Sequence, residues 1–186
     1  MMGKSVNRIV VPHLYIDTSV FGGILEGQHE ASVHLLETVK EKGWRCLTSA
    51  FTFMELSDIR QDNKFIYNQL ALGVHIKKAY RSLDQRNLSP HDLDTTQESV
   101  DVLFSENYPF VEFFGLNEFG WDRALEIKAT TNISAPDSVH VVTAIEAGCD
   151  VLVTLDNFIR KEAEALIPCC LPEQTNKVLK EYGFDI

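Results

Sequence analysis

Four acidic residues stand far apart along the chain, each next to a short apolar run or the predicted start of a helix. They are Asp17, Glu55, Asp137 and Asp156. Carboxylates are the ligands that hard divalent cations such as Mg²⁺ and Mn²⁺ prefer. A cation held in this way can activate water and stabilise negative charge on a phosphate. If the four side chains converge, they predict a metal-dependent hydrolytic site.

Three of these acids also have a purely structural explanation. Asp156 can cap the helix that follows it, and Asp17 can stabilise its turn through an Asx-type hydrogen bond. Ser134-Ala-Pro-Asp137 has the form of a capping box, with Ser134 as the N-cap. Taken singly, these three residues do not distinguish a capping role from a metal-binding role.

Glu55 fits a structural explanation least well. On a helix its neighbours one turn away are Phe51 and Ile59, so the carboxylate would lie on a largely apolar face. A carboxylate in that setting needs a cation or several hydrogen-bond donors. We therefore favour a functional role for Glu55 over a structural ion pair.

The elements that must position these residues alternate between strands and helices. Strands are predicted at 13–17, 45–49, 150–155 and 167–171, while 109–116 is either a strand or a tight apolar connection. Helices are predicted at 30–42, from Ser49 to about 60, within 63–85, and at 90–107, 121–130, 134–147, 157–166 and 172–183. The segment 18–23 is expected to be a loop. This alternation predicts an α/β fold with a mainly parallel sheet.

The position of two acids at strand ends supports a shared site. Asp17 follows Leu-Tyr-Ile, and Asp156 follows Val-Leu-Val-Thr-Leu. In a doubly wound parallel sheet, ligands bind outside the carboxyl ends of the strands. Both acids should then lie at the same rim of the sheet, with Thr18, Ser19 and Thr154 able to orient a carboxylate or a metal-bound water.

The composition suits a folded protein of one domain that needs metal to approach nucleic acid. Hydrophobic residues make up 45% and charged residues 24% of the 186-residue chain, and the net charge is −10. This charge argues against a broad basic surface, and it implies that the site without metal repels RNA.

The cysteines and the apolar runs indicate the compartment. The four cysteines lack metal-site spacing, and three of them lie inside or beside apolar runs, where a free thiol behaves as a small core residue, as in a reducing cytoplasm. The run Ile9-Val10-Val11 is too short for a secretion signal, and no run is long enough to cross a membrane. A cytoplasmic protein without a membrane partner is expected.

Four short motifs carry a resemblance to a known family. Tyr15–Val20, Phe53–Leu56, Ala135–His140 and Val153–Phe158 resemble, in order, the four acidic motifs of PIN domains, most closely those of VapC-type toxins. No single motif is specific, but all four occur in the expected order. The resemblance covers most of residues 13–170.

The resemblance implies a three-layer α/β/α fold and a metal-dependent ribonuclease. The implied metal-binding acids are Asp17, Glu55, Asp137 and Asp156, and the implied helper hydroxyl is that of Thr154, ahead of those of Thr18 and Ser19. The implied cofactor is Mg²⁺ or Mn²⁺, and the implied substrate is RNA. The resemblance further implies a homodimer and, in toxin systems, an antitoxin protein that blocks the site.

One region departs from the compact toxins. The stretch between Glu55 and Asp137 is longer and holds extra helical sequence, which we interpret as a helical insertion at about 62–107 within a single domain spanning 1–186. The insertion contains the basic cluster Lys77, Lys78 and Arg81. Such a cluster could follow an RNA backbone, but a solvated helix face is the commoner explanation.

Two further residue types near the acids bear on function. His140, one turn after Asp137, is expected to be a structural hydrogen-bonding residue rather than a catalyst. Arg160 and Lys161 follow Asp156 closely and are well placed to meet a phosphate near the metal.

Alternative functions are weighed on the same residues. A haloacid-dehalogenase-type phosphatase needs an acid two residues after Asp17, where this chain has Ser19, and a receiver domain needs a lysine after a late strand, which is missing. The remaining alternative is a PIN-like module that binds RNA or a protein without cutting. The intact set of four acids argues against it.

Overall fold

A computed structural model describes residues 11–186, in which five strands form one parallel sheet with the order β3-β2-β1-β4-β5. Ile9 and Val10, which belong to the short N-terminal run considered above, lie outside the described residues. The strands are β1 (His13–Ile16), β2 (Arg45–Ser49), β3 (Val111–Phe114), β4 (Val151–Val153) and β5 (Cys169–Cys170). Each neighbouring pair of strands is parallel, as predicted.

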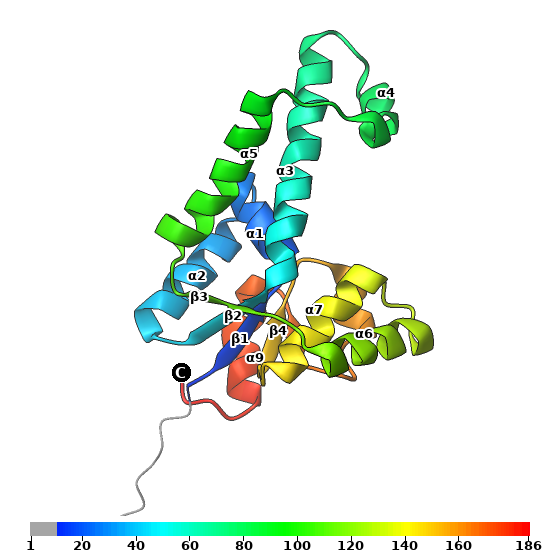
Figure 1. Cartoon of the computed structure of the whole chain (residues 1–186). Helices are drawn as coiled ribbons and strands as arrows, with labels where there is room; N and C mark the ends of the chain where they lie inside the picture. Colours follow the sequence, from blue (N-terminus) through cyan, green and yellow to red (C-terminus); the bar gives the residue numbers. More distant parts are fainter. Residues whose placement is uncertain (1–10) are drawn as a thin grey trace, which may run out of the picture.

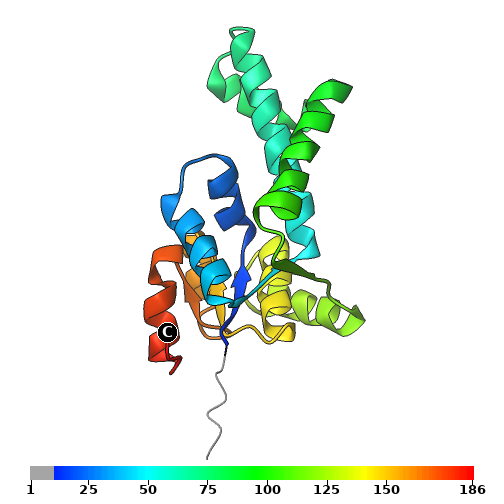
Figure 2. The ribbon, with the colours of Figure 1, turned by 90° about the vertical axis from the view of Figure 1, so that its left-hand side faces the viewer.

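The two faces of the sheet are covered by different helices, because successive side chains of a strand point to opposite faces. In β1, Leu14 and Ile16 join one buried cluster and Tyr15 joins the other. The first cluster includes residues of α1 (Thr18–Leu25), α2 (Glu30–Lys42) and α9 (Thr175–Glu181), and the second includes residues of α6 (Glu118–Thr130), α7 (Ala135–Glu146) and α8 (Asn157–Glu162). The predicted three-layer α/β/α fold is confirmed, and Figures 1 and 2 show the two helical layers on either side of the strands.

Capping residues set the starts and ends of several helices. Ser49 begins α3 by accepting a hydrogen bond from the amide of Phe51, and Gly43 ends α2 in the left-handed conformation with φ 64°. A residue without a side chain is favoured at that φ. These two boundaries agree with the sequence prediction, and together they fix β2 between two helices.

The expected loop at 18–23 is wrong, because this segment forms helix α1. Asp17 caps the helix by accepting from the amide of Ser19. Gly23 in this helix is needed for packing: a Cβ there would come within 3.0 Å of His29 Cβ and 3.3 Å of a Leu155 methyl carbon. The glycine thus allows α1 to approach the start of the next helix closely.

The helix that starts at Ser49 is longer than predicted. Helix α3 (Ala50–Ala71) runs without a break to Leu72, its C-cap, which is followed by Gly73 with φ 80°, so no new helix begins near Asn63. The sequence between Ser49 and Gly73 holds neither proline nor glycine, which explains the continuity.

The distal part of α3 and the segments that follow it form an arm that projects from the three-layer body (Figures 1 and 2). These segments are α4 (Ile76–Arg81), η1 (Leu83–Gln85), α5 (Pro90–Val102) and η2 (Leu103–Asn107). The region 62–107 is therefore helical as expected. Its status as an insertion relative to compact relatives stays a prediction.

The arm is held together by polar contacts between its two long helices. Lys64 lies 3.1 Å from Asp92, and Asn68 donates to the same carboxylate at 3.1 Å. Nearer the body, Arg60 Nε donates to Ser99 Oγ at 3.2 Å. Because these contacts recur along α3 and α5, the arm is a packed helical hairpin.

The remaining elements refine the sequence predictions. The undecided segment 109–116 contains the edge strand β3, α6 begins at Glu118, and α8 ends at Glu162 rather than near Leu166. The C-terminal helix starts as the short turn η3 (Pro172–Gln174) before α9. Within residues 11–186, the helices are all too short or too polar to cross a membrane.

Candidate active site

Asp17 lies directly after β1 and is almost completely buried, with 3% of its surface exposed. Its Oδ2 accepts hydrogen bonds from Ser19 Oγ at 2.6 Å and from Thr154 Oγ1 at 2.7 Å. The amide of Ser19 donates to the same oxygen at 3.3 Å. One carboxylate oxygen is thus fixed by hydroxyl groups from two elements, so the side chain has a single orientation.

Glu55 meets Asp17 at the imidazole of His140. Glu55 Oε2 accepts from Thr18 Oγ1 at 2.5 Å and lies 2.7 Å from His140 Nε2. Asp17 Oδ1 lies 3.9 Å from the same nitrogen. Helix α3 and the end of β1 therefore bring two carboxylates to one point.

Thr154 connects Asp17 to the backbone beside Asp156. Its hydroxyl is fully buried, donates to Asp17 Oδ2 and accepts from the amide of Asp156 at 3.0 Å. The carboxylate of Asp156 itself is exposed and caps α8, because Oδ1 accepts from the amides of Phe158 and Ile159. Asp156 is linked to Asp17 through Thr154 and its own backbone, not through a direct contact of its side chain.

Asp137 is half-buried at the start of α7. Its Oδ2 accepts from Ser134 Oγ at 2.6 Å, while Ser134 Oγ accepts from the Asp137 amide at 3.3 Å. The N-cap role expected of Ser134 is confirmed. Asp137 does not touch the other acids directly, but its charge acts on the imidazole of His140, one turn further along the helix.

The charges around His140 favour its protonated form. Burial disfavours the imidazolium, but the hydrogen bond to Glu55 and the negative charges of Asp17, Glu55 and Asp137 outweigh it and raise the pKa of His140. Burial would raise the pKa of Glu55, but the contact with His140 and the Thr18 hydroxyl lower it. In this state the positive charge of the protonated imidazole compensates part of the negative charge of the carboxylates around it.

Tyr15 is a member of the site that the sequence analysis did not single out. Its hydroxyl lies 2.6 Å from His140 Nδ1 and accepts from the amide of Ser49 at 3.1 Å. Because the imidazolium carries a proton on each ring nitrogen, Nδ1 donates to the Tyr15 hydroxyl while Nε2 donates to Glu55. A tyrosine inside an aliphatic strand beside Asp17 was the available signal, because a buried hydroxyl needs a partner.

The donor set fits a hard divalent cation. Asp17 and Glu55 offer carboxylate oxygens at one place, and Mg²⁺ is commonly held by one or two carboxylates together with water and phosphate. Within residues 11–186, no group of three or more acidic, histidine or cysteine side chains stands close enough to hold a metal ion by itself. The geometry therefore suits a cation completed by water and substrate rather than a closed protein cage.

Two adjoining cavities open beside Glu55. One, of about 240 Å³, is lined by Phe51, Met54, Glu55 and Asp58. The other, of about 400 Å³, shares Phe51 and Met54 and continues to Trp121 on α6. Open space with largely apolar walls thus exists next to Glu55.

Comparisons with known proteins give a match to a family and a match to a solved structure. A sequence profile described as "PIN domain" matches residues 14–164. Among solved structures, the chain is similar to one described as "Toxin-antitoxin complex from Klebsiella pneumoniae", with a TM-score of 0.49 and 14% sequence identity, over 86% of this chain and 97% of that chain. No curated protein matches the sequence.

Proposed function

The chain belongs to the PIN domain family, and on that premise we propose that it is a metal-dependent endoribonuclease that hydrolyses phosphodiester bonds in RNA. PIN domains are generally nucleases that use divalent metal ions. The observation that carries the proposal is the meeting of Asp17 and Glu55 at His140, at the carboxyl edge of the parallel sheet. Asp137, Asp156 and Thr154 complete the proposed site.

The chain's own residues have distinct roles in this proposal. Asp17 and Glu55 would hold Mg²⁺ or Mn²⁺, which when bound activates water and stabilises charge on the phosphate. Thr154 and Ser19 orient the Asp17 carboxylate through their hydroxyls. Asp137 and Asp156 stand further out, where they could hold water or a second ion.

His140 is a positioning residue in the same proposal. Its ring fixes Glu55 through Nε2 and is itself fixed by Tyr15 through Nδ1. A cation between the two carboxylates would take over the charge compensation that the imidazole proton supplies in the free site. Because the phosphate of RNA is negative, this exchange would also reduce the repulsion expected from an acidic protein.

A labelled single-stranded RNA digest tests the proposal. Purified protein should cleave the RNA with Mg²⁺ or Mn²⁺ and stop when EDTA is added. Absence of cleavage with either metal, together with retained RNA binding, would favour the alternative of a non-catalytic PIN-like module. A single-stranded DNA of the same sequence in parallel reports whether RNA is the preferred substrate.

We also propose that the activity is that of a toxin restrained by an antitoxin protein in the cytoplasm, as the motifs of the acidic site suggest. Induced expression should arrest growth, and the arrest should disappear with Asp17→Asn. Co-expression of the neighbouring open reading frame should restore growth if it encodes the antitoxin. Growth unaffected by the wild-type protein would contradict the toxin role while leaving the nuclease proposal open to the digest.

A homodimer is the proposed assembly. Met54 and Trp121 line the larger cavity beside the site and are 66% and 48% exposed, and Leu125, one turn along α6, is 65% exposed. Large apolar side chains gathered at one surface are typical of an interface. Light scattering after gel filtration should give twice the chain mass, and Trp121→Glu should return it to a monomer.

A further inference from the structure

The charge of this acidic chain is unevenly distributed along its arm. Residues 63–83 contain four lysine or arginine residues and neither aspartate nor glutamate, although the whole chain carries −10. This acid-free stretch covers the distal half of α3 and all of α4, the short helix at the end of the arm (Figure 1). Positive charge is therefore concentrated at the point farthest from the body.

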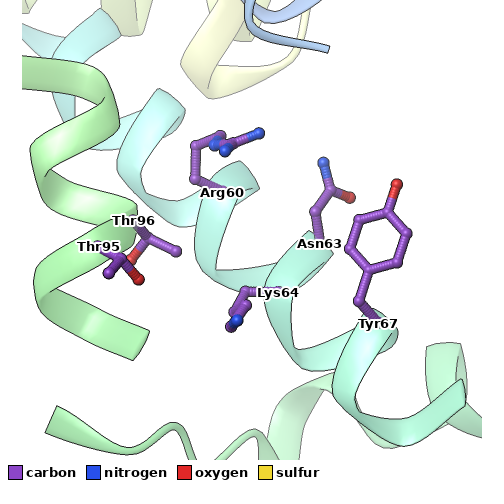
Figure 3. A pocket seen from close by; sticks show the side chains of 6 residues that line it. All are labelled: Arg60, Asn63, Lys64, Tyr67, Thr95 and Thr96. Carbon is purple, nitrogen blue, oxygen red and sulfur yellow. The ribbon is translucent and has the colours of Figure 1, made fainter. Parts of the chain in front are cut away.

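The cations nearer the body are already engaged. Arg86 forms ion pairs with both Asp58 and Asp62, and Lys64 forms one with Asp92. A cavity of about 170 Å³ lies there between α3 and α5, and Figure 3 shows Arg60, Asn63 and Lys64 on the α3 side of it. Because these charges have protein partners, they offer little free positive charge.

The cations of α4 differ in this respect. Lys77, Lys78 and Arg81 are exposed, and among the residues described, 11–186, none of the three lies within 4 Å of a carboxylate. Ala79 is the fully buried residue that fixes the helix against the arm. The three charges therefore face solvent on a helix that is held in place.

Aromatic surface accompanies these charges. Tyr80, between Lys78 and Arg81, is 57% exposed, and Tyr67 in the same acid-free stretch is 70% exposed. Exposed aromatic rings next to unpaired cations are the combination that binds single strands, since the cations meet phosphates and the rings stack on unpaired bases. A solvated helix face needs the charges but not the exposed rings.

We propose that α4 is a second nucleic-acid-binding site, which holds the single-stranded part of the substrate beyond the scissile bond. The inference rests on the proposed nuclease function, because it assigns the arm a role toward the same substrate. Helix α3 connects Glu55 to the arm's end, and 1.5 Å per residue gives about 24 Å between Glu55 and Ala71. A stacked strand that advances about 3.4 Å per nucleotide spans this distance in about seven nucleotides.

The test measures binding without cleavage. The protein carries Asp17→Asn and is kept in EDTA, and its affinity for a fluorescein-labelled uridine RNA of about 20 nucleotides is measured by fluorescence anisotropy. The measurement is repeated from about 50 to about 200 mM KCl, because salt in this range strongly weakens contacts with phosphate. The arm variant is K77Q/K78Q/R81Q. The matched control, K40Q/K128Q/K180Q, removes three exposed lysines from the body.

The arm variant should bind about ten-fold or more weakly at low salt, and the slope of log affinity against log salt should fall by about 2, as expected for three phosphate contacts on a single strand. The control should keep the parent slope. Equal slopes for the two triple variants would overturn the proposal. Because binding is measured without turnover, this result is independent of whether the wild-type protein cleaves RNA.

Two further measurements identify the ligand class. Tyr80→Ala should weaken binding about five-fold or more, while Tyr182→Ala, which removes a similarly exposed ring from the body, should not. Phosphatidylserine vesicles serve as the competing anionic surface. Binding of the arm to vesicles in preference to the RNA would assign α4 to a lipid surface and contradict the proposal.

Discussion

At the scale of single residues, the site is a small hydrogen-bonded network in which hydroxyl groups hold the carboxylates in place. Thr154 is central, because its one hydroxyl donates to Asp17 and accepts from the amide of Asp156. A valine at 154 keeps the volume but removes both hydrogen bonds. The Asp17 carboxylate would then lose one of its fixed donors.

We therefore expect Thr154→Val to weaken Mn²⁺ affinity or activity by about 10- to 100-fold, as for other residues that orient metal ligands. Thr154→Ser keeps the hydroxyl and should restore most of the loss. Calorimetric titration of Mn²⁺ into the three proteins checks the effect. If serine and valine were equally damaging, the role of Thr154 would be packing and not orientation.

The imidazole of His140 predicts a pH dependence of stability without metal. Its raised pKa means that folding stabilises the imidazolium, so this contribution is complete below about pH 6.5 and is lost as the pH rises through the raised value. The lowered pKa of Glu55 has the opposite sign, and its contribution is lost as the pH falls below about 4.5. Stability in EDTA should thus be highest in mildly acidic solution.

Thermal unfolding in EDTA at about pH 6 and about pH 8 checks this expectation. The wild-type protein should melt at a lower temperature at the higher pH, and His140→Gln should show a smaller difference between the two. A wild-type melting temperature that rises between these values would contradict the assignment of an imidazolium between the two acids.

At the scale of helices and strands, two glycines report on the boundaries of helices α1 and α2. Gly43 ends α2 at φ 64°, and a Cβ there would meet no atom within 4 Å, so any cost of a side chain comes from the backbone alone. Gly22 also has open space but lies inside α1 without a positive φ. The two glycines form a matched pair.

Gly43→Ala should lower the free energy of unfolding by about 1 kcal/mol, whereas Gly22→Ala should raise it by about 0.5–1 kcal/mol. Urea denaturation followed by circular dichroism measures both. A destabilising Gly22→Ala would indicate that residues 18–23 are not helical, as the sequence analysis first expected.

How far the elements could be predicted depended on how local their signals were. The C-terminal limit of α2 could be predicted from Gly43, because a glycine that ends a helix in the left-handed conformation is a local feature. The prediction of a loop at 18–23 was wrong, and the packing of Gly23 against His29 and Leu155 involves residues of other elements. Tertiary contacts of this kind leave no local pattern.

The candidate site also contains residues with local sequence signals and residues whose roles depend on tertiary contacts. Asp17 could be placed at the sheet edge from its strand alone, and Thr154 followed from the fourth motif. The role of Tyr15 could not be read, because it depends on the register that brings its hydroxyl to Ser49 and His140. The length of α3, in contrast, had a local signal, since neither proline nor glycine occurs between Ser49 and Gly73.

At the scale of the whole molecule, the proposed cation should stabilise an acidic protein that buries the Asp17 carboxylate. A ligand that binds the folded state alone stabilises it by about 2.7 kcal/mol at 100 times its dissociation constant. Mn²⁺ should therefore raise the melting temperature relative to EDTA, and the increase should vanish with Asp17→Asn. An equal increase in that variant would place the metal elsewhere on the acidic surface.

The measurement that tests the central claim most directly is the Mn²⁺-dependent cleavage rate of the Asp17→Asn variant beside the wild type, on the same labelled RNA. The substitution keeps the size of the side chain and leaves an oxygen for Ser19 and Thr154, so circular dichroism should be unchanged. We expect a loss of at least about 100-fold, since it removes a charge from the proposed metal ligand. Cleavage at the wild-type rate by the folded variant would contradict the account.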